Sequence, residues 1–225
     1  MATPLDLQEQ EQLDALKAFW NTYGNLITWA LIVVLGAYAA WNGWQWYQRD
    51  QGLKAGAMYD ELERAAQAGD IERTQRIFDD LRQRFPRTTF AQQGGLALAK
   101  LQIDKAQADK ARESLGWVAD QGGQDELRLL ARLRLAGVLL DAKQPEEALK
   151  QLGLVQGRAF EALAADRRGD VLAAMGKRDE AKAAYQAAYR AMDERQVLRR
   201  LVDAKLTALG APPEAASAAA SGAAP

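Results

Sequence analysis

Side chains that can act as acids, bases or nucleophiles are the first feature to examine in this sequence of 225 residues. The chain contains no Cys and no His, which excludes thiol nucleophiles, disulfides, Cys/His zinc sites, Ser-His-Asp triads and histidine-based pH switches. Carboxylates remain, and paired carboxylates are the residues of general acid and base catalysis. Adjacent pairs of acids include Asp79/Asp80, Glu146/Glu147 and Asp179/Glu180.

These pairs are better explained by helix structure than by catalysis. Adjacent residues on a helix point about 100° apart and do not face one another across a substrate. The second and third pairs stand where helices are expected to begin, and acids there offset the helix dipole. The sequence also contains no Walker loop, no GxGxxG and no EF-hand loop. It therefore predicts a protein that is not an enzyme, with no cofactor, no bound metal and no small-molecule substrate.

Charge is distributed unevenly along the chain. Residues 1–17 carry four acids and one Lys, residues 18–48 carry no charge, and residues 49–225 carry 28 basic and 26 acidic residues. A nearly neutral soluble part lacks the basic surface that binds phosphate backbones. The sequence therefore predicts no binding to nucleic acid.

The uncharged segment has the length and composition of a membrane span. Its middle, from Leu26 to Trp41, reads LITWALIVVLGAYAAW, and a bilayer core requires about 20 such residues. Aromatic residues flank it on both sides, as expected at the two headgroup levels, and they are predicted interface residues: Trp20, Tyr23, Trp41, Trp44, Trp46 and Tyr47. We predict one transmembrane helix at residues 20–47, in contact with the lipid bilayer.

Two other interpretations of this segment are less favoured. A buried helix of a soluble protein rarely needs so long an uncharged stretch with aromatic residues at both ends. A cleaved signal peptide is favoured by the small-x-small sequence Ala37-Tyr38-Ala39, but the preceding segment is acidic and the apolar run continues beyond it. Within an uncleaved anchor, Gly36, Ala40 and Gly43 are candidates for close helix packing, although Gly and Ala are common in membrane helices.

The remainder of the chain contains a helical repeat. Four segments align at the start of a second helix, and the equivalent residues Thr74, Ala111, Ala148 and Ala181 are separated by 37, 37 and 33 residues. These spacings bracket the 34-residue tetratricopeptide period. The sequence predicts an all-α fold: a transmembrane helix followed by a tetratricopeptide-like solenoid of helix hairpins.

At two fixed distances from these four anchor residues, the side chains have a characteristic size. Twelve positions earlier stand Leu62, Ala99, Ala136 and Gly169, of which three are small, and four positions later stand the bulky Phe78, Leu115, Leu152 and Tyr185. Two helices pack closely where one of them carries a small residue, so these positions define the hairpins. The first hairpin is degenerate, which also allows its first helix to continue directly from the membrane helix.

The solenoid suggests a binding surface and two terminal segments. Stacked hairpins form a curved groove that binds peptide or protein, and the third hairpin supplies its candidate residues, some of which could be core residues instead: Leu130, Leu133, Gly137, Leu140 and Asp141. A capping helix is expected from about residue 194 to 209. We predict a repeat domain at residues 48–210 and a disordered, Ala-rich tail at residues 211–225.

With these parts in place, the chain resembles the YfgM family of bacterial inner-membrane proteins, ancillary subunits of the Sec translocon. The resemblance is carried by EQLDALKAFWNTYGN before the span, LRLAGVLLDAKQPEEALKQL in the third hairpin and ADRRGDVLAAMGKRDEAKAAYQAA in the fourth. The first stretch is the more specific, because repeat proteins in general have no acidic amphipathic segment before a membrane helix.

This resemblance implies a topology and two protein partners. Residues 1–19 would be a short amphipathic cytoplasmic segment, and the repeat domain would lie in the periplasm of a single-pass inner-membrane protein. The partners would be the channel of the Sec translocon and a membrane-anchored periplasmic chaperone of prolyl-isomerase type. The function implied is that of a protein–protein interaction module that connects the translocon to chaperones for newly translocated proteins.

The charges beside the span favour a different orientation. One basic residue, Lys17, precedes the span, and three follow it closely: Arg49, Lys54 and Arg64. The positive-inside rule would then place the large domain in the cytoplasm, although large domains can be translocated regardless of charge. The alternative is therefore a cytoplasm-facing, membrane-tethered repeat scaffold that recruits a soluble regulator. A membrane-attached hydrolase is a third hypothesis, which rests only on the carboxylates.

Overall fold

The structure is a computed structural model, and it describes residues 7–121, 123–193 and 197–212. All regular secondary structure in these residues is α-helical, which confirms the predicted all-α class. The helices are α1 (Leu7–Gln67), α2 (Ile71–Arg84), α3 (Thr89–Asp104), α4 (Ala108–Gln121), α5 (Asp125–Asp141), α6 (Pro145–Gly153), α7 (Arg158–Ala174), α8 (Arg178–Ala191) and α9 (Val197–Ala208). The chain forms two compact units, residues 1–51 and residues 52–225.

The first unit consists of the greater part of α1. Large apolar side chains are exposed along it, including Trp29, Val33 and Trp41, which are 62%, 66% and 64% exposed. An α-helix that exposes apolar side chains over its whole circumference requires an apolar environment. It is the helix, among the described residues, that is long and apolar enough to cross a membrane.

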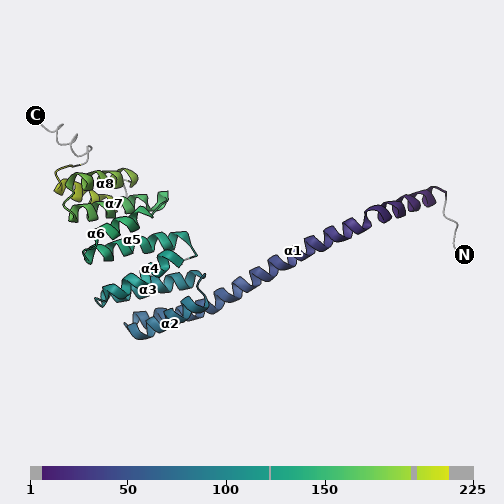
Figure 1. Ribbon diagram of the computed structural model, residues 1–225, viewed down its shortest axis with the longest axis horizontal. Coiled ribbons are helices and arrows are strands. Elements are labelled where there is room, and N and C mark those ends of the chain that lie inside the picture. The colour runs from purple at the N-terminus through teal and green to yellow at the C-terminus, as the bar shows by residue number, and fades with distance from the viewer. Residues whose placement is uncertain (1–6, 122, 194–196, 213–225) are drawn as a thin grey trace, which may run out of the picture. The chain divides into compact units, whose positions relative to one another are not determined.

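The second unit is a stack of helix hairpins. Each helix from α2 to α8 packs on the next one, and the first helices of successive hairpins, α3, α5 and α7, also contact one another (Figure 1). The last part of α1 takes the place of a first helix, since Ala55, Leu62 and Ala65 are buried with side chains of α2 and α3. The first hairpin therefore does continue directly from the apolar helix, within the single helix α1.

The turn inside each hairpin has the same geometry four times. One residue adopts a left-handed conformation five positions before each anchor residue: Gly69 (φ 72°), Ala106 (φ 58°), Lys143 (φ 61°) and Gly176 (φ 76°). The next backbone N–H then donates to a carbonyl five residues earlier, as in Asp70 to Ala65 and Lys177 to Leu172. This arrangement ends a helix and satisfies its last carbonyl groups. The repeat is therefore visible in the backbone as well as in the side chains.

The core runs through the whole stack. Its three parts are centred on Phe78 and Leu81 in the first hairpin, on Ala136 and Leu139 in the middle, and on Tyr185 and Val202 at the C-terminal end. The helix α9 covers this last part, with Val202 and Leu206 fully buried. Residues 194–196 of the predicted capping helix lie outside the described residues, as do residues 213–225 of the predicted tail.

Candidate functional site

The residues that defined the repeat in the sequence all lie inside the stack. The four anchor residues are 0% exposed, and the four bulky residues that follow them are at most 4% exposed. Of the positions twelve residues before the anchors, Leu62 and Ala99 are 0% exposed and Ala136 is 1% exposed. Their role in the structure is to bring each first helix close to its second helix.

Gly169 shows how tight this contact is in the fourth hairpin. A Cβ atom at this position would lie 2.4 Å from Cε1 of Tyr185, which is too close for any real side chain. The equivalent pairs in the second and third hairpins are Ala99 with Leu115 and Ala136 with Leu152. The larger tyrosine ring on the second helix therefore fits because the first helix carries glycine, which lacks the methyl group of alanine.

The predicted groove residues of the third hairpin differ in how accessible they are. Leu133 is 7% exposed and belongs to the core, so it offers little surface to a partner. Leu130 and Leu140 are half-buried, Asp141 is exposed, and Gly137 is half-buried with no atom within 4 Å of the place that a Cβ atom would take. Of the predicted groove residues, a partner can therefore reach Leu130, Gly137, Leu140 and Asp141.

In the fourth hairpin, the positions that correspond to Leu133 and Gly137 of the third hairpin are occupied by acids. Asp166 and Asp170 stand 15 and 11 residues before the anchor Ala181, as Leu133 and Gly137 do before Ala148. Nζ of Lys205 on α9 lies 2.7 Å from an Oδ1 atom of each aspartate (the side chains are 7% and 20% exposed). The helix α9 thus covers the positions of the fourth hairpin that correspond to Leu133 and Gly137, through a partly buried ion-pair cluster.

Tyr185 joins this cluster from α8. Its hydroxyl group donates a 2.8 Å hydrogen bond to Oδ1 of Asp170. Burial raises the pKa of the Tyr185 hydroxyl far above its usual value, and the hydrogen bond to Asp170 raises it further. The hydroxyl therefore stays protonated, and it acts as a fixed donor that orients the carboxylate toward Lys205.

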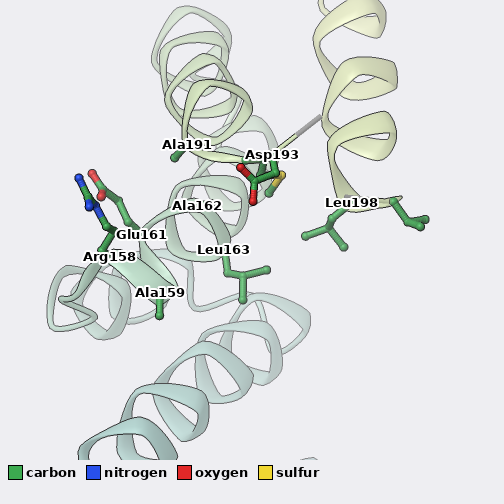
Figure 2. A pocket seen from close by; sticks show the side chains of 10 residues that line it. Arg158, Ala159, Glu161, Ala162, Leu163, Ala191, Asp193 and Leu198 are labelled. Atoms are coloured by element: carbon green, nitrogen blue, oxygen red, sulfur yellow. The ribbon is translucent and has the colours of Figure 1, made fainter. Parts of the chain in front are cut away.

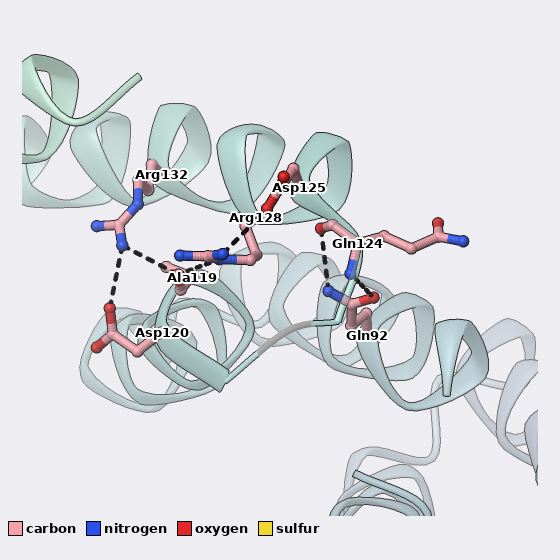
Figure 3. A network of polar contacts seen from close by, with 7 residues as sticks. All are labelled: Gln92, Ala119, Asp120, Gln124, Asp125, Arg128 and Arg132. Carbon is pink, nitrogen blue, oxygen red and sulfur yellow. Dashed lines mark hydrogen bonds and ion pairs between the residues drawn. The ribbon is translucent and has the colours of Figure 1, made fainter. Parts of the chain in front are cut away.

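A polar network holds the second hairpin against the third (Figure 3). Arg132 of α5 donates to the backbone carbonyl of Ala119 at 3.0 Å and to Oδ1 of Asp120 at 3.3 Å, both at the end of α4. Gln92, which is 0% exposed, exchanges two hydrogen bonds with the backbone of Gln124. Since the donors are buried and paired, the network fixes the relative position of successive hairpins.

A cleft of 710 Å³ opens near the C-terminal end of the stack (Figure 2). It is lined by the start of α7, the end of α8 and the first turn of α9, and Leu163 points across it toward Leu198. Its lining is mostly apolar, with Arg158, Glu161 and Asp193 as the charged members. This composition is suited to contact with another polypeptide rather than to chemistry.

The carboxylate pairs lie apart from this cleft and bind within their own helices. Asp79 pairs with Arg82 at 2.9 Å, Glu147 with Lys150 at 3.7 Å, and Asp179 with Lys182 at 3.7 Å. Glu146, Glu147, Asp179 and Glu180 occupy the first turns of α6 and α8. Among the described residues there is no cluster of three or more potential metal ligands.

The aromatic residues predicted at the membrane interface are at least half exposed in the first unit. Trp20 and Tyr23 are 59% and 50% exposed on one side of the uncharged segment, and Trp46 is 70% exposed on the other. Gly36 and Gly43 have no atom within 4 Å of a methyl position, and Ala40 is exposed. Among the described residues, these aromatic and small side chains are therefore exposed on the surface of α1.

Several structural residues had not been identified from the sequence. Gly94 and Gly95 lie in the middle of α3, where added Cβ atoms would be 3.0 Å from Leu62 Cδ1 and 2.5 Å from Val118 Cγ2. Two adjacent glycines lower the helix propensity of a segment, so their presence inside a helical pattern indicates close packing on both sides of the helix. Gln92 and Arg132 carry no such signal, because their partners are set by the position of the next hairpin.

Comparison with known proteins agrees with this architecture. The model of the family described as "Tetratricopeptide repeat-like domain" matches residues 17–211. A protein of Neisseria gonorrhoeae is 30% identical over 204 residues, which are 90% of this chain and 98% of that protein. A protein of Escherichia coli K12 is 28% identical over 182 residues, which are 80% and 86% of the two chains.

A third relative, from Haemophilus influenzae, is 29% identical over 182 residues, which are 81% of this chain and 89% of that protein. All three relatives carry the name "Ancillary SecYEG translocon subunit". The similarity covers the apolar helix and the hairpin stack together, so it is not confined to the repeat. The chain therefore belongs to the YfgM family of tetratricopeptide repeat-like proteins.

Proposed function

We propose that this protein is an ancillary subunit of the Sec translocon in the bacterial inner membrane, where it acts as a non-catalytic interaction module. The observation that carries the proposal is the similarity to ancillary SecYEG translocon subunits over 80–90% of the chain. An apolar helix followed by stacked hairpins provides a membrane attachment and a protein-binding surface in one polypeptide.

The orientation is part of the proposal. The N-terminal segment, residues 1–19, lies in the cytoplasm, residues 20–47 cross the membrane, and the repeat domain lies in the periplasm. Protease added to intact spheroplasts tests this directly in a chain tagged at its C-terminus. The tag is expected to be digested from outside while a cytoplasmic marker protein survives. Protection of the tag until the membrane is broken would contradict a periplasmic domain.

The repeat domain has a second partner in this proposal: a membrane-anchored periplasmic chaperone of prolyl-isomerase type, which receives newly translocated chains. Affinity purification of the full-length protein in mild detergent is expected to recover both channel subunits and this chaperone. Recovery of the channel alone would retain the translocon role and remove the chaperone. If neither is enriched and an unrelated complex is, the proposed function is wrong.

The predicted groove can be tested in the same purification with a matched pair of variants. Gly137→Arg places a long charged side chain on the first helix of the third hairpin, and Gly116→Arg places it on α4, a second helix. Both glycines are half-buried in helices and have no atom within 4 Å of a methyl position. Loss of the chaperone with the first variant and its retention with the second are expected if the first-helix face binds it.

A second candidate function rests on the charges beside the span. One basic residue before the span and three soon after it favour a repeat domain in the cytoplasm. In that case the protein is a membrane-tethered scaffold that recruits a soluble regulator. The spheroplast experiment separates the two candidates, because it reports on which side of the membrane the tag lies.

A further inference from the structure

The outer face of α9 is apolar, although it is the last described helix of the stack. With 100° per residue, Val197, Leu201, Ala204 and Ala208 fall within one narrow stripe on the side away from the core. Val197 is 83% exposed and Leu201 is 51% exposed, and both alanines are exposed as well. The opposite side of the same helix carries the fully buried Val202 and Leu206.

This composition is unlike that of a helix that simply closes a solenoid. A terminal helix needs a polar outer face to remain soluble, because no further hairpin covers it. Of the residues that follow α9, Leu209 packs against the core, and residues 213–225 contain no apolar side chain larger than proline that could bury Val197 and Leu201. Burial of this stripe therefore requires a partner that provides a matching apolar helix.

We propose that the outer face of α9 is a self-association surface and that it packs antiparallel against α9 of a second copy of this chain. In the register in which the two-fold axis passes between Val202 and Asp203, Val197 lies opposite Ala208 of the other copy. Leu201 then lies opposite Ala204. Each bulky side chain meets a small one in both directions, so the stripe is complementary to itself under two-fold symmetry.

The charges beside the stripe fit the same register. Arg200 is exposed on one edge, and Asp203 is half-buried on the same side of the helix. In an antiparallel pair this edge faces the same edge of the second copy, and Arg200 comes within two residues of the position opposite Asp203. Two symmetric ion pairs therefore flank the apolar contact. Lys205 does not interfere, because it binds Asp166 and Asp170 on the other side of α9.

The contact is short, and this sets the conditions under which it forms. A helix of 12 residues is about 18 Å long, so its area lies below that of a standard protein–protein interface. Two copies held in one membrane meet at a high effective concentration, which compensates for a small contact area. The association is therefore expected for the full-length chain in a bilayer and is expected to be weak in dilute solution.

Cysteine cross-linking tests the pairing cleanly, since the chain has no Cys of its own. Full-length Leu201→Cys and Ala204→Cys chains, distinguished by tags of different mass, are reconstituted together in phosphatidylcholine vesicles and mildly oxidised. The mixed disulfide is expected to form about tenfold faster than the dimer of Leu154→Cys at the same density. Leu154 is the matched control, because it is a 50% exposed leucine outside α9.

A charge exchange distinguishes specific pairing from random collision. Arg200→Asp in both tagged chains is expected to slow the mixed disulfide to the control rate, and Arg200→Asp combined with Asp203→Arg is expected to restore it. Circular dichroism of each variant verifies that the helices are retained. Equal rates at positions 201/204 and 154 would overturn the proposal, as would a charge exchange that restores nothing. The outcome is independent of whether the protein binds the translocon.

Discussion

Gly169 lies where the ring of Tyr185 leaves no room for a side chain. Gly169→Ala gains about 1 kcal/mol in helix propensity but forces the ring or the helix to move, which costs typically 1–3 kcal/mol. We expect a net loss of stability of roughly 1–2 kcal/mol, measured by urea denaturation followed by circular dichroism. Gly137→Ala is the control, since nothing lies within 4 Å there, and it is expected to be neutral or stabilising.

A second substitution tests the cause. Tyr185→Leu together with Gly169→Ala reproduces the Ala–Leu pair that the second and third hairpins use at the same positions. If the clash with the ring is the reason for the loss, the double variant is more stable than the sum of the two single changes. Simple additivity would show that the glycine has another role, because coupled residues are the ones that depart from additivity.

Ala106 tests whether the repeated turn is strained where it lacks glycine. A non-glycine residue in the left-handed region costs about 1 kcal/mol or more, and Ala106 adopts φ 58°. Ala106→Gly is therefore expected to stabilise the protein by up to about 1 kcal/mol, after the greater freedom of glycine in the unfolded chain is subtracted. Gly176→Ala in the fourth turn is expected to do the reverse. A fall in the denaturation midpoint for both would refute the strain argument.

At the scale of the helices, Arg132 connects α5 to α4 and α6. It donates to Ala119, Asp120 and, at 2.9 Å, to Oε1 of Gln151, and its side chain is only 11% exposed. Arg132→Ala removes a donor from the buried carbonyl of Ala119 and also breaks the bonds to Asp120 and Gln151, so we expect a loss of about 2–3 kcal/mol in urea denaturation. Arg128→Ala is the comparison on the same helix: Nε of Arg128 reaches the same Ala119 carbonyl only at 3.4 Å and its side chain is 38% exposed, so a loss below about 1 kcal/mol is expected.

The helices themselves were predictable, and their mutual contacts only partly so. Ala111, Ala148 and Ala181 recur at a nearly constant spacing, so the sequence alone identified the hairpins and the side of each helix that is buried. Arg132 looks like any surface arginine, because its partners at the end of α4 are brought to it by packing between hairpins. Lys205 is similar, since its two aspartates lie 39 and 35 residues earlier in the chain.

For the whole molecule, the sequence predicted an apolar helix followed by stacked helix hairpins and left the function of one surface open. The uncharged segment and the repeat have different hydrophobic patterns, and each pattern has a direct physical cause. The predicted groove residues have no distinct hydrophobic pattern of their own. Leu133 and Leu130 are both apolar and three residues apart, yet Leu133 is in the core and Leu130 is half-buried. Apolar residues that bind partners and those that pack hairpins cannot be separated by periodicity on a helix that is buried on two sides.

The last part of α1 belongs to the repeat domain, and shortened chains test this. A chain beginning at residue 52 keeps Ala55, Leu62 and Ala65, so we expect it to unfold cooperatively and to leave the membrane fraction. A chain beginning at residue 71 lacks all three and uncovers Phe78 and Leu81, which are 1% and 0% exposed in the intact domain. Loss of Leu62 alone corresponds to roughly 2–5 kcal/mol, so this shorter chain is expected to lose the first hairpin and to melt at lower temperature. Equal melting of the two chains by circular dichroism would show that the solenoid begins at α2 and that the end of α1 serves only as a linker.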